Sequence, residues 1–468
     1  MGRTIEVNPV TRIEGHAKIA LHLDDAGNVA SAQLKVLEIR GFEKLLDRTE
    51  LFKMPLITAR ICGVCPVAHH MVSVLAIENG LGVQAPPEAR LLRELMYLGN
   101  ILHSHSLSVF VLSGPDVVLG IGAPPADRNV FNLLRLAPEL VMKMLRLRTI
   151  GQRIVETVGG RGIHPVTAVP GGMASRPAKE ELATIAQWAS QASALLEEII
   201  GVLAGKLPQL AEFRDWVGLP PQPLALSRAG EHSYLDGNCT VLDGSGSITR
   251  SFAPAEYGRH LVEHVLPGSY MKAVRIRAEE ETSYFVGPLA RLNVNDRIAG
   301  RQAQQMLEEL HARGRPSLAA LDNIEARLIE MVSAAERAGA IAGEELCGGP
   351  IRVDCEPRAG RFVAAVEAPR GLLVHDYTVD KSGRITAANF IVATQNNYDA
   401  INEAVRQAAQ FCLPRNDEAF LMNGMEFALR CFDPCLSCAT HSAGRLPMEV
   451  RIYRHGKLDR TIVRRLDA

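Results

Sequence analysis

The chain has 468 residues, of which 47% are hydrophobic and 22% are charged, a composition typical of a folded globular protein with a large core. Its formal net charge of −1 gives no electrostatic support for binding to nucleic acid or to an acidic membrane surface. The sequence has no run of about 18 uninterrupted apolar residues and no apolar secretory segment near its N-terminus. We therefore expect a cytoplasmic protein without a membrane span.

The first elements along the chain are strands, and long helices follow. Alternating apolar and polar residues predict strands at 5–10, 16–23 and 29–39, with a hairpin turn at 24–28. Residues 207–290 are rich in Pro, Gly and turn dipeptides, which indicates an irregular or β-containing excursion. Apolar residues at three- and four-residue spacing predict the helices. The predicted helices span residues 88–113, 129–158, 178–206, 300–346, 397–412 and 416–431.

A second β region is expected after the helices. Strands are predicted at 361–366, 371–379 and 384–393. Residues 442–468 are expected to form a strand, a turn at 455–457 and a second strand on the surface. The elements together predict one α+β body with a central bundle of long helices, an N-terminal sheet and a small β region near the C-terminal third.

Two Cys-x-x-Cys pairs, Cys62/Cys65 and Cys435/Cys438, lie near opposite ends of the chain. The total of nine cysteines is odd, which fits metal or redox chemistry in a reducing compartment better than a disulfide framework. Each pair alone is compatible with a structural zinc site, a thioredoxin-type redox pair or a transition-metal centre. Structural zinc sites gather their ligands locally, which these pairs do not. If the pairs meet, four thiolates form a site that suits zinc, iron or nickel.

The residues around the two pairs resemble a known family. Residues 60–69, Arg-Ile-Cys-Gly-Val-Cys-Pro-Val-Ala-His, and residues 433–441, Asp-Pro-Cys-Leu-Ser-Cys-Ala-Thr-His, are similar to the two signature motifs of the large, catalytic subunit of nickel–iron hydrogenases. Residues 11–16, 40–43 and 367–371 are similar to three further blocks of this family and occur in the same order. The resemblance runs from residue 4 to the C-terminus and implies reversible heterolytic cleavage of H2.

The resemblance implies a metal centre built by the cysteines. Cys62, Cys65, Cys435 and Cys438 would bind nickel, and Cys65 and Cys438 would also bridge to an iron that carries CO and cyanide ligands. Soft thiolates suit nickel. Heterolysis leaves the proton of H2 on a nearby base, which the resemblance implies is the thiolate of Cys435.

Three charged residues match functional positions of the family. Glu14 matches the proton gate, since a carboxylate buried beside a metal can have its pKa moved towards the working pH. Arg370 matches a guanidinium held over the open metal position, and we expect Asp433 to orient Arg370 through a bidentate pair. The ordinary alternatives are an ion pair between Glu14 and Arg12, a surface salt bridge of Arg370 and a turn-capping role of Asp433.

Other residues match positions around the metals. Glu43, His441 and the backbone carbonyl of Ala387 match the ligands of a magnesium ion. Magnesium prefers oxygen ligands, so the histidine in this set rests on resemblance alone. His69 matches a hydrogen-bond donor to a bridging sulfur, and Thr394 matches a hydrogen-bond partner of a cyanide. The alternatives are a satisfied core histidine and a strand hydroxyl bonded to the backbone.

One position departs from the membrane-bound and periplasmic branch of the family, which has Asp within its counterpart of residues 103–105. This chain has Ser104, which favours the cytoplasmic, multi-subunit branch, where electrons reach a nicotinamide-linked diaphorase or another flavin-containing subunit. The five other cysteines lack iron–sulfur spacing, so we expect the partner to be an iron–sulfur small subunit. No Gly-x-Gly-x-x-Gly follows a strand, which places NAD(P) on another chain.

The C-terminal residues have a second interpretation. In the family, a dedicated maturation endopeptidase often removes an extension after the histidine of the second motif. Residues 1–441 would then form the catalytic domain, and residues 442–468 would keep the metal site open until nickel is bound. The sequence leaves open two other protein classes. An H2 sensor usually lacks the extension, and a scaffold related to the quinone-site subunit of respiratory complex I lacks the four cysteines.

Overall fold

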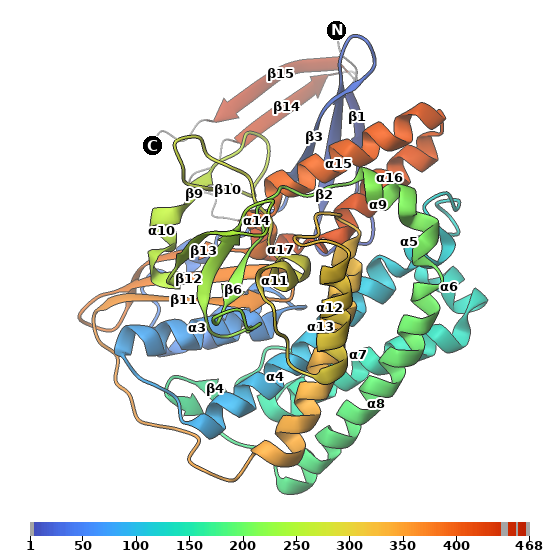
Figure 1. Ribbon diagram of the computed structural model, residues 1–468. Helices are drawn as coiled ribbons and strands as arrows, with labels where there is room; N and C mark the ends of the chain where they lie inside the picture. The colour runs from blue at the N-terminus through green and yellow to red at the C-terminus, as the bar shows by residue number, and fades with distance from the viewer. Residues whose placement is uncertain (1–3, 441–447, 455–456, 465–468) are drawn as a thin grey trace.

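Long helices cross the centre of the computed structural model, and small antiparallel sheets lie around them (Figure 1). The structure describes residues 4–440, 448–454 and 457–464, and it describes side chains in the first of these ranges. The predicted α+β class is therefore confirmed. The long helices are α3 (Pro66–Leu81), α4 (Pro87–Ser106), α7 (Pro138–Gly159), α8 (Lys179–Ala204) and α13 (Asp322–Ala340).

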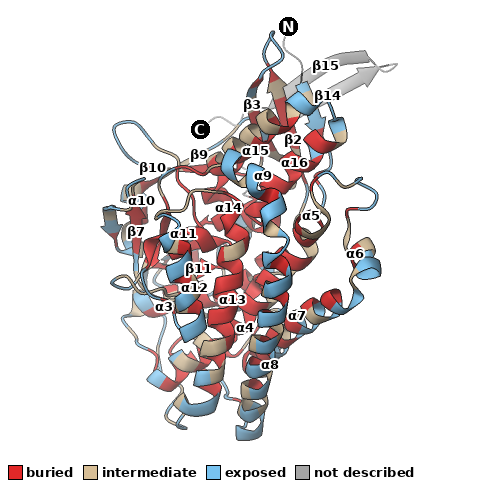
Figure 2. Cartoon of the chain, turned by 45° about the vertical axis from the view of Figure 1, so that its right-hand side comes forward, coloured by how far each residue is buried: buried red, intermediate tan, exposed pale blue. Residues whose placement is uncertain are grey.

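Helices α3, α4 and α13 are mostly buried, whereas α8 has an exposed outer face (Figure 2). Helix α4 continues into a π-helical turn, η3 (Leu107–Leu112). Over Pro87–Leu112 this helix is long and apolar enough to cross a membrane, and it is the single such candidate in the described part of the chain. Since 78% of its apolar window is buried inside the protein, the protein core accounts for its composition.

Two helices expected to be continuous are interrupted. The predicted helix 129–158 is α6 (Val130–Leu136) followed by α7, because Pro138 restricts the preceding Ala137 to a non-helical backbone with φ −140°. The predicted helix 300–346 is α12 (Arg301–Ala312) followed by α13, and Gly314 at φ +128° lies in the break.

The predicted N-terminal sheet is confirmed as three antiparallel strands in the order β1 (Thr4–Val7), β2 (Ala17–Leu23) and β3 (Val29–Val36). Helix α15 (Tyr398–Cys412) packs on β3, and α16 (Glu418–Cys431) packs on α15. The N-terminal sheet and the helix that leads into the second cysteine pair therefore lie in the same part of the molecule (Figure 1).

The remaining β elements also match the expectations. The later sheet has the order β11 (Gly360–Ala368), β12 (Gly371–Val379) and β13 (Ile385–Ile391). The C-terminal hairpin pairs β14 (Met448–Arg454) with β15 (Lys457–Arg464). Residues 207–290 contain β6 (Leu224–Ser227), β7 (Asn238–Leu242), β8 (Ile248–Phe252), β9 (Leu261–His264) and β10 (Ala273–Ile276).

Close contact between α4 and α7 depends on glycine. A Cβ atom at Gly151 would lie 2.5 Å from the backbone nitrogen of His103, and one at Gly99 would lie 2.8 Å from Cγ2 of Ile154. Neither contact leaves room for a side chain, so these two positions set the distance between the helices.

We expect Gly151→Val to lower the free energy of unfolding by about 3 kcal/mol, because the added side chain must push α7 away from α4. Gly201→Val is the matched control. Gly201 is an exposed residue of α8 with nothing within 4 Å of an added Cβ, so its effect should stay within about 0.5 kcal/mol. Thermal and denaturant unfolding measure both changes. Equal destabilisation by the two substitutions would contradict the close packing.

Candidate metal centre

The two Cys-x-x-Cys pairs meet in the protein interior, as predicted. The Sγ atoms of Cys62, Cys65, Cys435 and Cys438 all lie within 4.8 Å of one another, and all four residues are buried. The Sγ–Sγ distance is 3.4 Å between Cys62 and Cys435 and 3.4 Å between Cys65 and Cys438. Within residues 4–440, no other group of His, Cys, Asp and Glu is arranged to hold a metal ion.

Each pair sits on a turn that begins a helix. Cys65 precedes the first turn of α3, and the backbone N–H groups of Val64 and Cys65 donate to Cys62 Sγ over 3.3 and 3.4 Å. Cys435 precedes the short helix α17 (Leu436–Ala439), and its N–H donates to Thr394 Oγ1 over 2.9 Å. These backbone hydrogen bonds fix the Cys62 side chain at the start of the turn.

The pKa shifts within the cysteine cluster indicate a site for a cation. Hydrogen bonds from the neighbouring thiols, above all that of Cys435, lower the pKa of Cys65 well below its usual range. The same network raises the pKa of Cys435, and burial raises the pKa of Cys438. Four thiolates cannot share this space without positive charge, so metal binding is expected to release protons from the cluster.

Glu14 lies against the second cysteine pair. Its carboxylate accepts hydrogen bonds from the Ser437 backbone N–H over 2.9 Å and from the Ser437 hydroxyl, and Cys435 Sγ lies 3.2 Å from Oε2. Its backbone carbonyl accepts from Leu436 N–H over 3.1 Å. Arg12 binds Asp116 instead of Glu14, so the alternative of a Glu14–Arg12 ion pair is wrong. Glu14 is half-buried and thus links the buried sulfur with the surface.

Arg370 and Asp433 are both buried and in contact. Arg370 Nη2 donates to Asp433 Oδ1 over 3.0 Å, and Nε donates to the Asp433 backbone carbonyl over 2.6 Å. The predicted bidentate pair with the carboxylate is therefore corrected to one carboxylate bond and one carbonyl bond. Asp433 has a left-handed φ of +51°, which places its carbonyl beside its own carboxylate at the guanidinium. The alternative of a surface salt bridge is wrong, because the Arg370 side chain is 3% exposed.

A second buried arginine fixes the loop that carries Arg370. Arg291 binds Glu330 through Nε and Nη2 over 2.6 Å each, and its Nη1 donates to Glu367 Oε2 and to the Ala368 carbonyl over 3.0 Å each. Charges of Glu330 hold the pKa of Arg291 above its ordinary value against the opposing effect of burial. This pair was not predicted from the sequence. The available signal was the isolated charge of Arg291 in the otherwise uncharged helix α11 (Pro288–Val294), whereas α13 carries several charges and does not single out Glu330.

His69 and Thr394 lie beside the sulfurs, where they were predicted. His69 Nε2 is 3.3 Å from Cys438 Sγ, and its Nδ1 is 3.1 Å from His375 Nε2. Thr394 belongs to the short helix α14 (Ala393–Asn396), and its hydroxyl accepts a hydrogen bond from the backbone N–H of Cys435. The alternative of a hydroxyl bonded to the backbone is therefore correct, although Thr394 lies in a helix and not in a strand. A small cavity lies between these groups. Its lining includes Cys65, His69, Pro369, Arg370, Leu373, Val392, Thr394, Cys435 and Cys438.

The predicted magnesium ligands are only partly described. Glu43 lies in α1 (Phe42–Leu45), which contacts the strand β13 that contains Ala387. His441 lies outside the described residues. The magnesium site therefore stays a prediction.

The role of the C-terminal extension stays a prediction, because the expected cut follows His441, which lies outside the described residues. Within the described residues, contacts of Glu14 with Leu436 and Ser437 hold the second cysteine pair. Of the five remaining cysteines, Cys239, Cys412 and Cys431 are buried, whereas Cys355 is half-buried and Cys347 is exposed.

The sequence matches two family models. One is described as HoxL-like and matches residues 4–39, and the other is described as nickel-dependent hydrogenase and matches residues 40–137. The vhu F420-non-reducing hydrogenase of Methanococcus voltae has a subunit that is 37% identical over 427 residues, which cover 89% of this chain and 100% of that protein. The NAD-reducing hydrogenase HoxS subunit beta of Cupriavidus necator is 34% identical over 479 residues, which cover 97% of this chain and 98% of that protein.

Solved structures show the same architecture. The NAD+-reducing NiFe hydrogenase in its H2-reduced state matches with a TM-score of 0.89 and 36% identity, over 94% of this chain and 99% of that one. A NiFeSe hydrogenase of Dm. baculatum has the same fold, with a TM-score of 0.79 at 24% identity. Since relatives more than 30% identical span nearly the whole chain, it belongs to the large-subunit family of nickel-dependent hydrogenases and is the catalytic subunit of an oxidoreductase.

Proposed function

We propose that this chain cleaves H2 heterolytically and reversibly at a nickel–iron centre held by its four clustered cysteines. The observation that carries the proposal is the buried group of four Sγ atoms within 4.8 Å, with a carboxylate oxygen of Glu14 3.2 Å from one of them. When bound, the metals supply a redox-active Lewis acid that polarises H2. The protein supplies the thiolates, a base, a fixed positive charge and the exclusion of water.

The donor set and the cavity fit this metal centre. All four cysteines would bind nickel, and Cys65 and Cys438 would also bind an iron with CO and cyanide ligands. The small cavity beside Cys65 and Cys438 has an apolar wall formed by residues such as Leu373 and polar groups from Arg370 and Thr394. An apolar wall suits CO, and polar groups that can donate a hydrogen bond suit cyanide. A structural zinc site needs no such cavity.

The side chains around the four cysteines would have separate roles in proton transfer and charge stabilisation. Cys435 would accept the proton of H2, and Glu14 would receive it from Cys435 and pass it towards the surface. Burial alone would lower the pKa of Arg370, but the negative charges of Asp433 and of the cysteines raise it well above the ordinary value. Arg370 would therefore stay charged and stabilise negative charge that develops at the centre. His69 would tune the bridging sulfur of Cys438 through its hydrogen bond.

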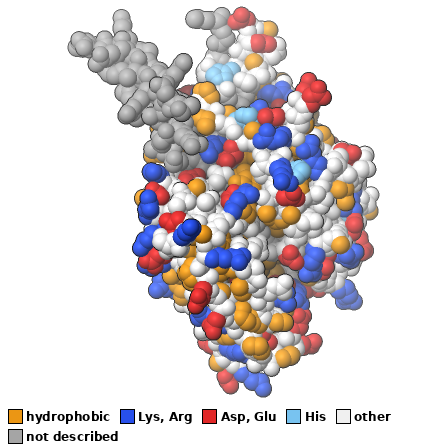
Figure 3. Space-filling view, turned by 90° about the vertical axis from the view of Figure 1, so that its left-hand side faces the viewer, with side chains coloured by type: hydrophobic (Ala, Val, Ile, Leu, Met, Phe, Trp, Pro, Cys, Tyr) orange, Lys and Arg blue, Asp and Glu red, His pale blue; other side chains and the backbone are white. Residues whose placement is uncertain are grey.

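We also propose a docking face for an iron–sulfur small subunit near the first cysteine pair. Large apolar residues are exposed in the segments around it: Leu37, Ile39, Leu45, Leu56 and Ile163. Arg40 donates to the Ile61 carbonyl over 3.2 Å, which fixes the first of these segments next to the motif. On the face shown in Figure 3, apolar side chains are concentrated between scattered charges. Exposed large apolar residues grouped near one another are typical of a permanent subunit interface.

We propose a terminal electron acceptor and a cellular location that the relatives support. Electrons would leave through the small subunit to a flavin-containing partner of the diaphorase type and on to NAD(P) or another soluble acceptor, in a cytoplasmic complex. The NAD-reducing and F420-non-reducing relatives support this class of acceptors. Glu43, His441 and the carbonyl of Ala387 would bind magnesium. The four cysteines argue against a metal-free scaffold of the complex I type.

Metal analysis and infrared spectroscopy test the centre. We expect nickel and iron near 1:1, little zinc, and stretching bands of CO and cyanide in the purified enzyme. Cys65→Ser should remove iron and these bands, because one bridging thiolate is lost, whereas the exposed Cys347→Ser should keep both. A nickel-loaded wild-type sample without such bands would disprove the assignment.

The role of Glu14 has its own test. We expect Glu14→Gln to slow H2 oxidation and the formation of HD from D2 in H2O by about 100-fold or more, because the carboxylate that accepts the proton is lost. Nickel and iron contents should not change, since Glu14 binds neither metal. Glu38→Gln is the matched control, because it removes a nearby carboxylate that is hydrogen-bonded to His16 instead of Ser437. Unchanged exchange in Glu14→Gln would exclude the proposed gate.

The extension gives a further prediction. We propose that the maturation endopeptidase cuts after His441 and removes residues 442–468. Intact mass spectrometry of the active protein should therefore show a chain that ends at His441. Full nickel content and full activity in a protein that still ends at Ala468 would contradict the cleavage.

A further inference from the structure

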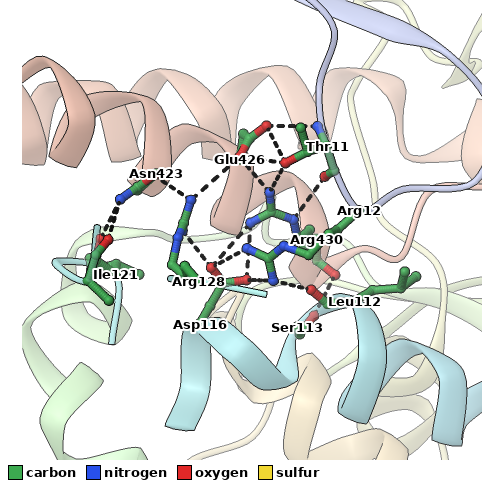
Figure 4. Close-up of polar contacts among 11 residues, drawn as sticks. Thr11, Arg12, Leu112, Ser113, Asp116, Ile121, Arg128, Asn423, Glu426 and Arg430 are labelled. Carbon is green, nitrogen blue, oxygen red and sulfur yellow. Dashed lines mark hydrogen bonds and ion pairs between the residues drawn. The ribbon is translucent and has the colours of Figure 1, made fainter. Parts of the chain in front are cut away.

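Five charged side chains from four segments converge behind Glu14, and we call them the arginine cluster: Arg12, Asp116, Arg128, Glu426 and Arg430 (Figure 4). Asp116, in α5 (Gly114–Leu119), lies at its centre and is fully buried. Arg12 binds both carboxylate oxygens of Asp116 over 2.7 and 2.8 Å. Arg128 and Arg430 bind the same carboxylate over 2.6 and 3.0 Å. The cluster thus joins parts of the chain that are distant in sequence.

The charges of the arginine cluster do not balance. Three guanidinium groups face two carboxylates, which leaves one positive charge in excess. Arg12 is the most exposed of the three arginines, at 15% compared with 3% for Arg128 and 0% for Arg430. Buried charges are stable when they are paired, so the two inner arginines and the two carboxylates would already form a balanced set. Arg12 is therefore not needed to neutralise the core.

Arg12 instead fixes the segment that carries Glu14. Its backbone has a left-handed φ of +56°, which L-residues rarely adopt without supporting contacts. Besides Asp116, its guanidinium binds the carbonyl of Leu112 over 2.5 Å. The preceding Thr11 donates its N–H to Glu426 over 2.7 Å, and its carbonyl accepts from Arg430 over 3.1 Å. The chain is thus anchored immediately before Glu14.

The same segment is anchored immediately after Glu14. Gly15 has a φ of +83°, and a Cβ atom there would lie 2.8 Å from Cβ of Leu436. Leu436 N–H donates to the Glu14 carbonyl over 3.1 Å, so the backbone of α17 is in direct contact with the backbone of this segment. Arg430, in α16, lies five positions before Cys435. The arginine cluster therefore holds both the Glu14 segment and the segment that leads to Cys435.

We propose that Arg12 is a positioning residue for proton transfer: its bidentate pair with Asp116 fixes the backbone so that the Glu14 carboxylate stays within reach of Cys435 Sγ. The inference rests on the proposed role of Glu14 as the proton acceptor. A carboxylate on a loop without this anchor would sample many positions, and misplacement by about 1 Å can cost on the order of 100-fold in rate.

The test compares Arg12→Gln with Arg128→Gln in the assembled, metal-loaded enzyme. Both substitutions remove one positive charge from the arginine cluster. Arg128 binds Asn423 and Asp116 and lies 3.6 Å from Glu426, but it forms no hydrogen bond with residues 11–15. We expect Arg12→Gln to lower kcat and HD formation from D2 by about tenfold or more. The KM for H2, the metal content and the infrared bands should not change. Arg128→Gln should keep the wild-type rate of HD formation.

A double substitution separates the outcomes. If Arg12 acts through Glu14, Arg12→Gln/Glu14→Gln should exchange no more slowly than Glu14→Gln alone, because the two losses are not additive. Equal slowing by Arg12→Gln and Arg128→Gln, or wild-type exchange in Arg12→Gln while Glu14→Gln is slow, would overturn the positioning role and leave the gate intact. Wild-type exchange in Glu14→Gln would instead overturn the gate itself. Thermal unfolding of each variant identifies a loss that comes from misfolding.

Discussion

The structure depends on one constraint, which is that two cysteine pairs from opposite ends of the chain share a buried site. Four sulfur atoms within 4.8 Å repel one another when they are thiolates, so the surrounding fold has to hold them together. Cys65 is held at the start of α3, and Cys435 is held by Thr394 and by its bridge to Glu14. Everything else in the site is arranged around this junction of the chain ends.

Buried arginines supply most of the rigidity around the junction. Arg291 binds the carbonyls of the loop that carries Arg370, and Arg430 binds the carbonyl of Thr11 near Glu14. A guanidinium has five donors in a fixed plane and keeps its charge when buried, so one side chain can bind carboxylates and several carbonyls at once. Arg291 thereby fixes the guanidinium of Arg370 on one side of the sulfur atoms, and Arg430 fixes the carboxylate of Glu14 on another.

The sequence predicted the parts of the site whose signal is local. The Cys-x-x-Cys spacing pointed to the metal-binding cysteines, and the resemblance of the flanking motifs to the hydrogenase family was enough to place Glu14, Arg370 and His69 near them and Asp433 against Arg370. The helix breaks at Pro138 and in residues 313–321 were missed although Pro138, Gly314 and Pro316 mark them, because the helices were predicted from apolar periodicity on either side. The bonding of Arg370 to a carbonyl depends on the backbone angle of Asp433, which periodicity and motif spacing do not determine.

The ion pairs of Arg291 and Arg12 could not be predicted from the sequence. Each lies far along the chain from its carboxylate partner, so neither partner can be chosen from spacing. Their surroundings also differ in a way that bears on function. The partners of Arg291 are fully buried within this chain, whereas the segment of Arg12 and Glu14 is half-buried, and Arg40 holds the exposed Leu37 and Ile39 close to the first cysteine motif. A partner protein that covered this face would exclude bulk water from the segment that carries Glu14.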